Sequence, residues 1–322
     1  MNGFYTCLTY KGMERALKMT SIPVPSEKDK IQVDDSALLN FIAWGDPQIS
    51  SLSPLRAARL TSACKDLNNT EGKFDALLLL GDITEYGREC EYNMARNILS
   101  KSKDKFDNLL CVSGNHDVRL RSYKHQVQKF ENFVKSVPNG RVSETSHYYF
   151  SVNIKGYKFI MLGTDTSTFE GEYLSRKQLS WLDKELATAE KGKPVFVLNH
   201  QTIANTNGLP RTWLGKGNWR GSVGWQSEKL ANIMSKYPNT IYISGHLHYG
   251  VSKYNYEDCG NFKSLSVPTV GVMNHGEFDY DAQGYIISVY EDKIICRARI
   301  FGKGEWVDKS VQNSIIEIPI KK

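Results

Sequence analysis

Five short polar motifs follow apolar runs in this chain, and together they constrain its fold more than any other feature. In chain order the motifs are Gly45-Asp46-Pro47-Gln48, Gly81-Asp82, Gly114-Asn115-His116-Asp117, Asn199-His200 and Gly245-His246-Leu247-His248. Each motif stands where a buried strand would end. Ligand sites of open α/β sheets lie beyond the carboxyl ends of the strands, so we expect the motifs to gather at one site.

The motif residues are of the kinds that bind divalent metal ions. Carboxylate and imidazole suit Mn, Fe or Zn, and an amide oxygen serves as a neutral hard ligand. A carboxylate at Asp82 could bridge two ions. Taken alone, a Gly-Asp pair after a strand is more often a turn or a helix N-cap. In the last motif, two histidines two residues apart point to the same side of an extended segment, and Gly245 lets the backbone approach closely.

The periodicity of the chain predicts strands alternating with helices, followed by hairpins. Strands are predicted over residues 38–44, 74–80, 108–112, 148–154, 157–162, 194–198, 240–244, 285–290, 293–300 and 314–318. Helices are predicted over residues 54–67, 88–100, 118–135 and 175–190. Alternation implies a largely parallel layer, whereas the hairpins imply antiparallel strands. Two packed mixed sheets with helices outside satisfy both patterns.

One large domain is the simplest organisation for these 322 residues. The motifs extend from Asp46 to His248, so a single site draws on most of the chain. We therefore predict a domain over residues 38–322. Residues 1–37 are polar and irregular, and we predict that they form an N-terminal extension on the surface.

The composition excludes several other classes of protein. A net charge of +6 is mildly basic, and no Lys/Arg run is long enough to indicate a nucleic-acid polymer as partner. The six cysteines lack C-x-x-C spacing, which is typical of free thiols. The sequence contains no apolar stretch of membrane-spanning length, and its N-terminal 20 residues have no apolar signal-peptide core. A soluble, cytoplasmic protein is the default expectation.

As a set, the motifs resemble those of the calcineurin-like metallophosphoesterases. The family pattern is Asp-x-His, Gly-Asp-x-x-Asp/Asn, Gly-Asn-His-Asp/Glu, a lone His and Gly-His-x-His, and the resemblance covers about residues 38–250. It implies an α/β fold, a four-layer α-β-β-α sandwich of two mixed β-sheets. It also implies two divalent metal ions. The first would be held by Asp46, Gln48, Asp82 and His248, and the second by Asp82, Asn115, His200 and His246.

By the same resemblance, His116 is the general acid and Asp117 holds its ring. Two positions depart from the family pattern. Gln48 stands where histidine is usual, and Glu85 stands where Asp or Asn closes the second motif. Asp-Pro-Gln in the first motif looks like a known phosphatase subgroup. An amide binds soft metals less well than imidazole does, so our hypothesis is a first site that binds metal more weakly and prefers Mn or Mg. Glu85 is expected to support a site residue from outside the metal ligands or to be structural, without a catalytic role.

A glycine-rich loop between His200 and His246 is the candidate for substrate recognition. It contains three tryptophans and three cations, of which we select Trp213, Trp219 and Arg220 as candidate substrate-binding residues. Such side chains could stack a base or clamp a phosphate. The alternative remains open that the tryptophans pack the loop onto the body and the cations are solvated.

The sequence as a whole indicates a binuclear metal-dependent phosphohydrolase. The resemblance implies that a metal-bridging hydroxide attacks phosphorus while His116 protonates the leaving alkoxide. Two ions drawn from Mn, Fe, Zn or Mg are expected, with Mn favoured, and the partner is a small phosphorylated substrate. The aromatic loop weakly favours a phosphodiester or nucleotide-like substrate. A phosphomonoesterase or phosphoprotein phosphatase is the rival enzyme, and a non-catalytic protein-binding scaffold is the rival from another class.

Overall fold

The computed structural model describes residues 9–144, 148–209, 221–272 and 281–321, and its strands form two mixed sheets. The first sheet has the order β12 (Glu305–Trp306), β11 (Lys293–Ile300), β10 (Gln283–Val289), β1 (Leu39–Trp44), β2 (Ala76–Leu80), β3 (Leu109–Val112), and β13 (Ile315–Pro319) also pairs with β11. The second has the order β4 (Phe150–Ile154), β5 (Tyr157–Met161), β6 (Val195–Leu198), β7 (Thr240–Ser244), β9 (Phe262–Ser266), β8 (Tyr256–Asp258).

Both sheets have a parallel centre and antiparallel margins, as the alternation of predicted elements indicated. β1, β2 and β3 run parallel, whereas β10, β11, β12 and β13 join them through antiparallel pairs. In the second sheet β5, β6, β7 and β9 are parallel, and the β4–β5 hairpin and β8 are antiparallel. The strands that precede the five motifs are β1, β2, β3, β6 and β7, all within the parallel centres.

Alternating side chains along the strands divide the interior into three hydrophobic cores. Phe41 of β1 and Phe196 of β6 meet between the sheets, with ring centroids 4.9 Å apart. Their neighbours Ile42 and Val197 point the other way, each toward helices that cover the outer face of its own sheet. The layers are therefore α-β-β-α, and the predicted four-layer sandwich is confirmed.

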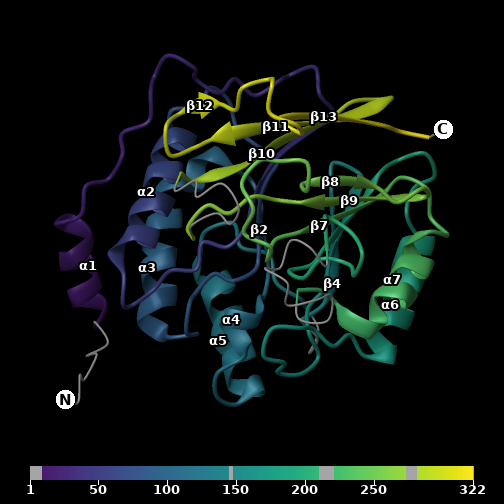
Figure 1. Cartoon of the computed structure of the whole chain (residues 1–322), viewed down its shortest axis with the longest axis horizontal. Helices are drawn as coiled ribbons and strands as arrows, with labels where there is room; N and C mark the ends of the chain where they lie inside the picture. The colour runs from purple at the N-terminus through teal and green to yellow at the C-terminus, as the bar shows by residue number, and fades with distance from the viewer. Residues whose placement is uncertain (1–8, 145–147, 210–220, 273–280, 322) are drawn as a thin grey trace.

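The helices cover the two outer faces of the sandwich (Figure 1). The first sheet is covered by α2 (Pro54–Asn68), α3 (Glu89–Leu99) and α5 (Tyr123–Ser136), and the second by α6 (Arg176–Ala187) and α7 (Ser227–Met234). The remaining helix, α1 (Tyr10–Lys18), packs against α2 and α3. Short helical turns form α4 (Asn115–Val118), η1 (Ser100–Lys105) and η2 (Gly224–Gln226). Across the described ranges, none of the helices combines the length and the apolar character needed to cross a lipid bilayer.

The structure corrects two of the predicted elements. Residues 1–37 are not wholly irregular, because α1 is a helix that buries Met13 against the core beneath α2 and α3. The helix predicted over residues 118–135 is instead split into α4 and α5. Arg121 between them has a φ of 77°, and a left-handed residue cannot continue a right-handed helix.

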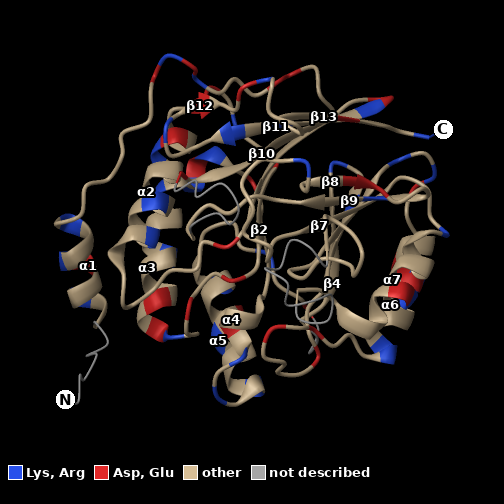
Figure 2. Cartoon of the chain, viewed as in Figure 1, with Lys and Arg blue, Asp and Glu red and all other residues tan. Residues whose placement is uncertain are grey.

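Figure 2 shows basic and acidic residues interspersed along the helices and loops, as expected for an ordinary charged surface.

Candidate metal centre

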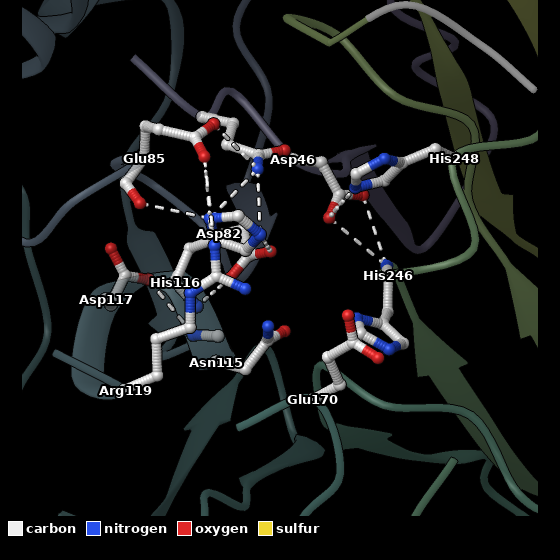
Figure 3. A network of polar contacts seen from close by, with 12 residues as sticks. Asp46, Asp82, Glu85, Asn115, His116, Asp117, Arg119, Glu170, His246 and His248 are labelled. Carbon is white, nitrogen blue, oxygen red and sulfur yellow. Dashed lines mark hydrogen bonds and ion pairs between the residues drawn. The ribbon is translucent and has the colours of Figure 1, made fainter. Parts of the chain in front are cut away.

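The five motifs converge at the carboxyl ends of the central strands. Asp46 and Gln48 follow β1, Asp82 follows β2 and Asn115 follows β3. The second sheet contributes three imidazoles, from the side chains after β6 and β7: His200, His246 and His248. Figure 3 shows five of these side chains gathered at this end of the strands: Asp46, Asp82, Asn115, His246 and His248.

The backbone around the centre is strained at several positions. Five of the predicted ligands have left-handed backbone conformations, with φ between 41° and 70°: Asp46, Gln48, Asp82, His246 and His248. Non-glycine residues rarely adopt such angles, and where they do so they cluster at functional sites. Glycines permit the close approach of the loops. A Cβ on Gly81 would collide with the ring of His200, and one on Gly114 would collide with the carboxylate of Asp82.

Asp82 is the residue around which two ligand groups are organised. One group combines its carboxylate with His200 and His246, and the other combines it with Asp46 and His248. Within each group the ligand atoms lie within 4.8 Å of one another. A carboxylate common to two such groups is the arrangement expected of a residue that bridges two metal ions.

The second predicted ligand group has the spacing of atoms that share one ion. Nε2 of His200 lies 3.3 Å from Oδ2 of Asp82, 3.1 Å from Oδ1 of Asn115 and 3.1 Å from Nδ1 of His246. Two ligands that are each about 2.1 Å from one ion lie about 3–3.5 Å apart. The spacing of these four side chains therefore fits a single metal ion.

Hydrogen bonding leaves two of the predicted ligand oxygens without a donor within the described chain. The His200 ring, at Nδ1, lies 2.7 Å from the carbonyl oxygen of Leu80, to which it donates when Nδ1 carries the proton. Nε2 then presents a lone pair to the oxygens of Asp82 and Asn115. Within the described part of the chain, Oδ2 of Asp82 and Oε1 of Gln48 are buried without a hydrogen-bond partner. Hydrogen-bond acceptor atoms that face one another in a buried site repel each other, and a bound cation would remove this repulsion.

The electrostatics of the pocket also favour positive charge. Burial alone lowers the pKa of His200, but the carboxylates of Asp82 and Asp46 outweigh burial and raise it to about 10. A fully buried imidazole would otherwise prefer to be neutral. Burial raises the pKa of Asp82, yet the neighbouring rings of His200 and His116 hold it below its ordinary value. The residues present therefore fit a pair of divalent cations.

Comparison with known proteins agrees with this geometry. A family model described as "Calcineurin-like phosphoesterase" matches residues 40–250. The chain belongs to this family. The family match and the two ligand groups of the structure together support a calcineurin-like phosphoesterase fold with a dimetal centre.

Two curated relatives and one solved structure are similar to this chain. A protein of Arcobacter nitrofigilis named "Probable glycerophosphodiester phosphodiesterase" is 23% identical over 56% of this chain and 59% of its own length. A Mycobacterium tuberculosis protein named "cAMP/cGMP dual specificity phosphodiesterase" is 24% identical over 60% of this chain. The chain thus spans 59% and 55% of these two relatives. A dimetal phosphatase from Danio rerio shares the fold, with a TM-score of 0.60, 13% identity and coverage of 88% of this chain and 100% of that one.

The two departures from the calcineurin-like pattern contact each other. Nε2 of Gln48 lies 3.0 Å from Oε2 of Glu85, and the same nitrogen lies 3.1 Å from both ring nitrogens of His116. The Gln48 amide is thereby turned so that its NH₂ group faces Glu85 and His116. Its oxygen, Oε1, is then the atom available to a metal ion.

Glu85, not Asp117, contacts the ring of His116. Nδ1 of His116 lies 3.0 Å from the carbonyl oxygen of Glu85 and 3.2 Å from its Oε1. Asp117 instead accepts hydrogen bonds from the backbone N–H groups of Ile83, Thr84 and Gly114, at 3.0–3.1 Å. The prediction that Asp117 holds the His116 ring is therefore wrong. Consecutive residues of the α4 turn point in different directions, so Asp117 faces the loop after β2.

Three predicted substrate-binding residues lie outside the described structure, and two residues beside the centre were not predicted from the sequence. Trp213, Trp219 and Arg220 lie outside the described residues. Sequence reasoning missed Arg119, whose Nη2 lies 2.9 Å from Nδ1 of His116. The signal was available, since residues three apart share one face of a helical turn. It also missed Phe169, whose carbonyl accepts a hydrogen bond from Nδ2 of Asn115 at 3.3 Å, and no motif marks this position.

Proposed function

We propose that this chain hydrolyses phosphoesters of small molecules with two divalent metal ions, with a preference for phosphodiester or nucleotide-like substrates. The observation that carries the proposal is the shared position of Asp82 in two ligand groups, with its Oδ2 buried and lacking a hydrogen-bond donor within the described chain. The names of the curated relatives favour diesters over monoesters, since each is called a phosphodiesterase. A cytoplasmic location and the boundary at residue 38 remain predictions.

His116 has the position expected of the group that protonates the leaving oxygen. When bound, two divalent ions would neutralise the phosphoryl oxygens and supply the water-derived nucleophile. Contacts with Glu85 occupy Nδ1 of His116, and Nε2 lies 3.9 Å from Oδ2 of Asp82. Burial lowers the pKa of His116, but the negative charges of Asp82 and Glu85 raise it above its ordinary value, against the opposing charge of Arg119. A protonated imidazole in this position can donate to a leaving oxygen.

We expect Glu85→Gln to lower kcat/KM about 10–100-fold, the usual effect of changing a residue that orients a catalytic or metal-binding side chain. Burial raises the pKa of Glu85, but His116 and Arg56 lower it to about 2, so the wild-type side chain is a carboxylate. Glutamine keeps the shape and removes the charge beside the ring. The loss should therefore be greatest for substrates with poor leaving groups, as measured over a series of aryl and alkyl phosphoesters.

Asp117→Asn is the matched control for Glu85→Gln. It changes a second buried carboxylate beside the centre, one that accepts hydrogen bonds from backbone N–H groups and from the hydroxyls of Thr84 and Tyr92 instead of contacting the His116 ring. Its main effect should be a loss of stability of about 1–3 kcal/mol, measured by denaturant unfolding. If Asp117→Asn altered leaving-group dependence and Glu85→Gln did not, the assignment of Glu85 would be wrong.

Manganese is the proposed metal, and Gln48 is the reason for this preference. An amide oxygen is a hard, neutral ligand, whereas imidazole suits Zn and Fe. We therefore expect Gln48→His to tighten Zn binding relative to Mn binding, in competition titrations of the metal-stripped protein. The same relative affinities in Gln48→His and in the wild type would refute this role for Gln48.

The experiment that tests the proposed function compares p-nitrophenyl phosphate with its bis ester, after metal removal and reloading with Mn. Faster hydrolysis of the bis ester would support the phosphodiesterase. Faster hydrolysis of the monoester would support the rival phosphomonoesterase and direct attention to phosphoproteins or small metabolites. No hydrolysis of either, with less than stoichiometric metal, would leave the protein-binding scaffold as the better description.

A further inference from the structure

Phe169 is an exposed aromatic side chain beside the metal centre. Its side chain is 67% exposed, which sets it apart from the buried phenylalanines of the three cores. The carbonyl oxygen of the same residue accepts a hydrogen bond from Asn115, one of the predicted ligands. Phe169 thus combines a backbone that contacts the metal site with a ring that faces solvent.

The loop that carries Phe169 is fixed to the site at several points. Nδ2 of Asn199 lies 2.5 Å from Oε2 of Glu172, which is buried, and Nε2 of Gln201 lies 3.3 Å from the carbonyl oxygen of Gly171. On the other side of Phe169, the hydroxyl of Ser167 donates to the carbonyl oxygen of Val118 at 3.3 Å. These contacts hold both flanks of Phe169, so the loop presents the ring to solvent in a defined place.

The ring lies next to Arg119, which itself contacts the proposed general acid. The guanidinium carbon of Arg119 is 5.0 Å from the centroid of the Phe169 ring, within the range of a cation–π contact. Nη2 of the same Arg119 is 2.9 Å from Nδ1 of His116, the proposed general acid (Figure 3 shows Arg119 beside His116). Arg119 thus lies against the ring of the proposed general acid, and the carbonyl of Phe169 lies against Asn115, so the Phe169 ring is within reach of a substrate held at the centre.

We infer that Phe169, with Arg119 against it, is a stacking platform for a planar ring on the leaving group of the substrate. The inference rests on the proposed phosphoesterase function and adds to it the class of leaving group. Aromatic faces bind planar rings of many kinds, because every such ring has a π-face. Arg119 is a cation beside His116, and a guanidinium binds phosphoryl oxygens, so one pair of side chains could contact both parts of the substrate.

The test uses two substrates that differ in ring shape and little in leaving-group chemistry: benzyl phosphate and cyclohexylmethyl phosphate. Their methyl diesters replace them if the enzyme is a diesterase. Phe169→Ala should lower kcat/KM for the planar benzyl ester about tenfold or more, the range found when stacking residues are replaced by alanine. The same variant should change kcat/KM for the saturated ester less than twofold. Phe169→Tyr should restore the benzyl preference.

Tyr173→Ala provides a control on the same loop. Tyr173 is 39% exposed, and its backbone N–H and carbonyl make its hydrogen bonds to Thr164 and Asp165, so alanine preserves them. Both esters should retain wild-type rates in this variant. Equal losses for the two esters in Phe169→Ala would overturn the inference in favour of a loop-stabilising role. Equal rates in Phe169→Ala and wild type would overturn it as well.

Binding measurements separate this inference from the proposed function. Calorimetry with benzylphosphonate and cyclohexylmethylphosphonate on the Mn-loaded protein should show tighter binding of the planar ligand, and Phe169→Ala should abolish that difference. If the wild type hydrolysed the esters without discriminating between them, the platform would be wrong and the phosphoesterase would stand. If the wild type hydrolysed none of the phosphoesters, the proposed function itself would fail.

A further pair of substrates identifies the source of the ring. Adenosine 5′-phosphate and ribose 5-phosphate differ by the base alone. A loss confined to adenosine 5′-phosphate in Phe169→Ala would support a nucleobase as the natural ring. A loss confined to benzyl phosphate would support a phenyl ring closer to the phosphorus.

Discussion

Replacing Asp82 with asparagine is expected to remove both metal ions and to lower kcat/KM by about a thousandfold or more, since metal stabilisation of a transition state is worth several kcal/mol. The asparagine amide would keep an oxygen for the hydrogen bond that the backbone N–H of His116 donates to Oδ1 of Asp82 at 2.8 Å. It would lose the negative charge that belongs to both ligand groups. The loss would therefore report on metal bridging and not on the hydrogen bond.

Metal analysis and thermal unfolding measure this effect without relying on activity. Elemental analysis should find two Mn ions per wild-type chain after reloading and fewer than one per Asp82→Asn chain. A metal at a thousand times its dissociation constant stabilises a folded protein by about 4 kcal/mol, so Mn should raise the unfolding temperature of the wild type. The variant should lack this rise. Asp117→Asn, which changes a buried carboxylate outside both ligand groups, should keep both ions.

A different result would change the assignment of the ligands. An Asp82→Asn chain that still held two ions would show that Asp82 is not the bridge. Retention of one ion would show that one group, either Asp46 with His248 or His200 with His246, binds without the shared carboxylate.

The fold could be predicted from the sequence because its central strands are continuous apolar runs. β2 is built from Ala76 and four leucines, and such a run, bounded by turn residues, is typical of a strand buried on both faces. The short helix α1 was missed because its exposed face is rich in charge, although Tyr10, Met13 and Leu17 have helical spacing. The split between α4 and α5 depends on the positive φ of Arg121, which no pattern of side chains predicts.

The gathering of the motif residues could also be predicted, whereas their mutual contacts could not. Parallel strands end at one edge, so Asp46, Asp82 and Asn115 had to lie near one another. Which carboxylate meets His116 depends instead on the direction of each side chain. Asp117 follows His116 in the chain but points to the loop after β2, and Glu85 reaches the ring from that loop. Loop geometry of this kind is set by tertiary contacts and leaves no periodic signal.

Replacing His116 with glutamine is expected to slow hydrolysis about 10²–10⁴-fold for esters of poor leaving groups, which is the usual contribution of a general acid. Esters of p-nitrophenol should be slowed far less, because a stable phenolate departs without a proton. The measurement is the slope of log kcat against the pKa of the leaving alcohol, which should be steeper in the variant. Metal content should remain at two ions per chain, since His116 belongs to neither ligand group.

The dependence on pH gives a second and independent readout of the same residue. Activity that needs protonated His116 falls as the pH rises through the pKa of the ring. Burial lowers this pKa, but the carboxylates of Asp82 and Glu85 outweigh burial, so the net pKa lies above its ordinary value. His116→Gln should lack this alkaline decline for esters of poor leaving groups, and Glu85→Gln should move the decline to lower pH. An unchanged alkaline limb together with an unchanged leaving-group slope in His116→Gln would assign proton donation to another group. The stacking platform at Phe169 would then no longer mark the leaving-group side, because its placement depends on the position of the acid.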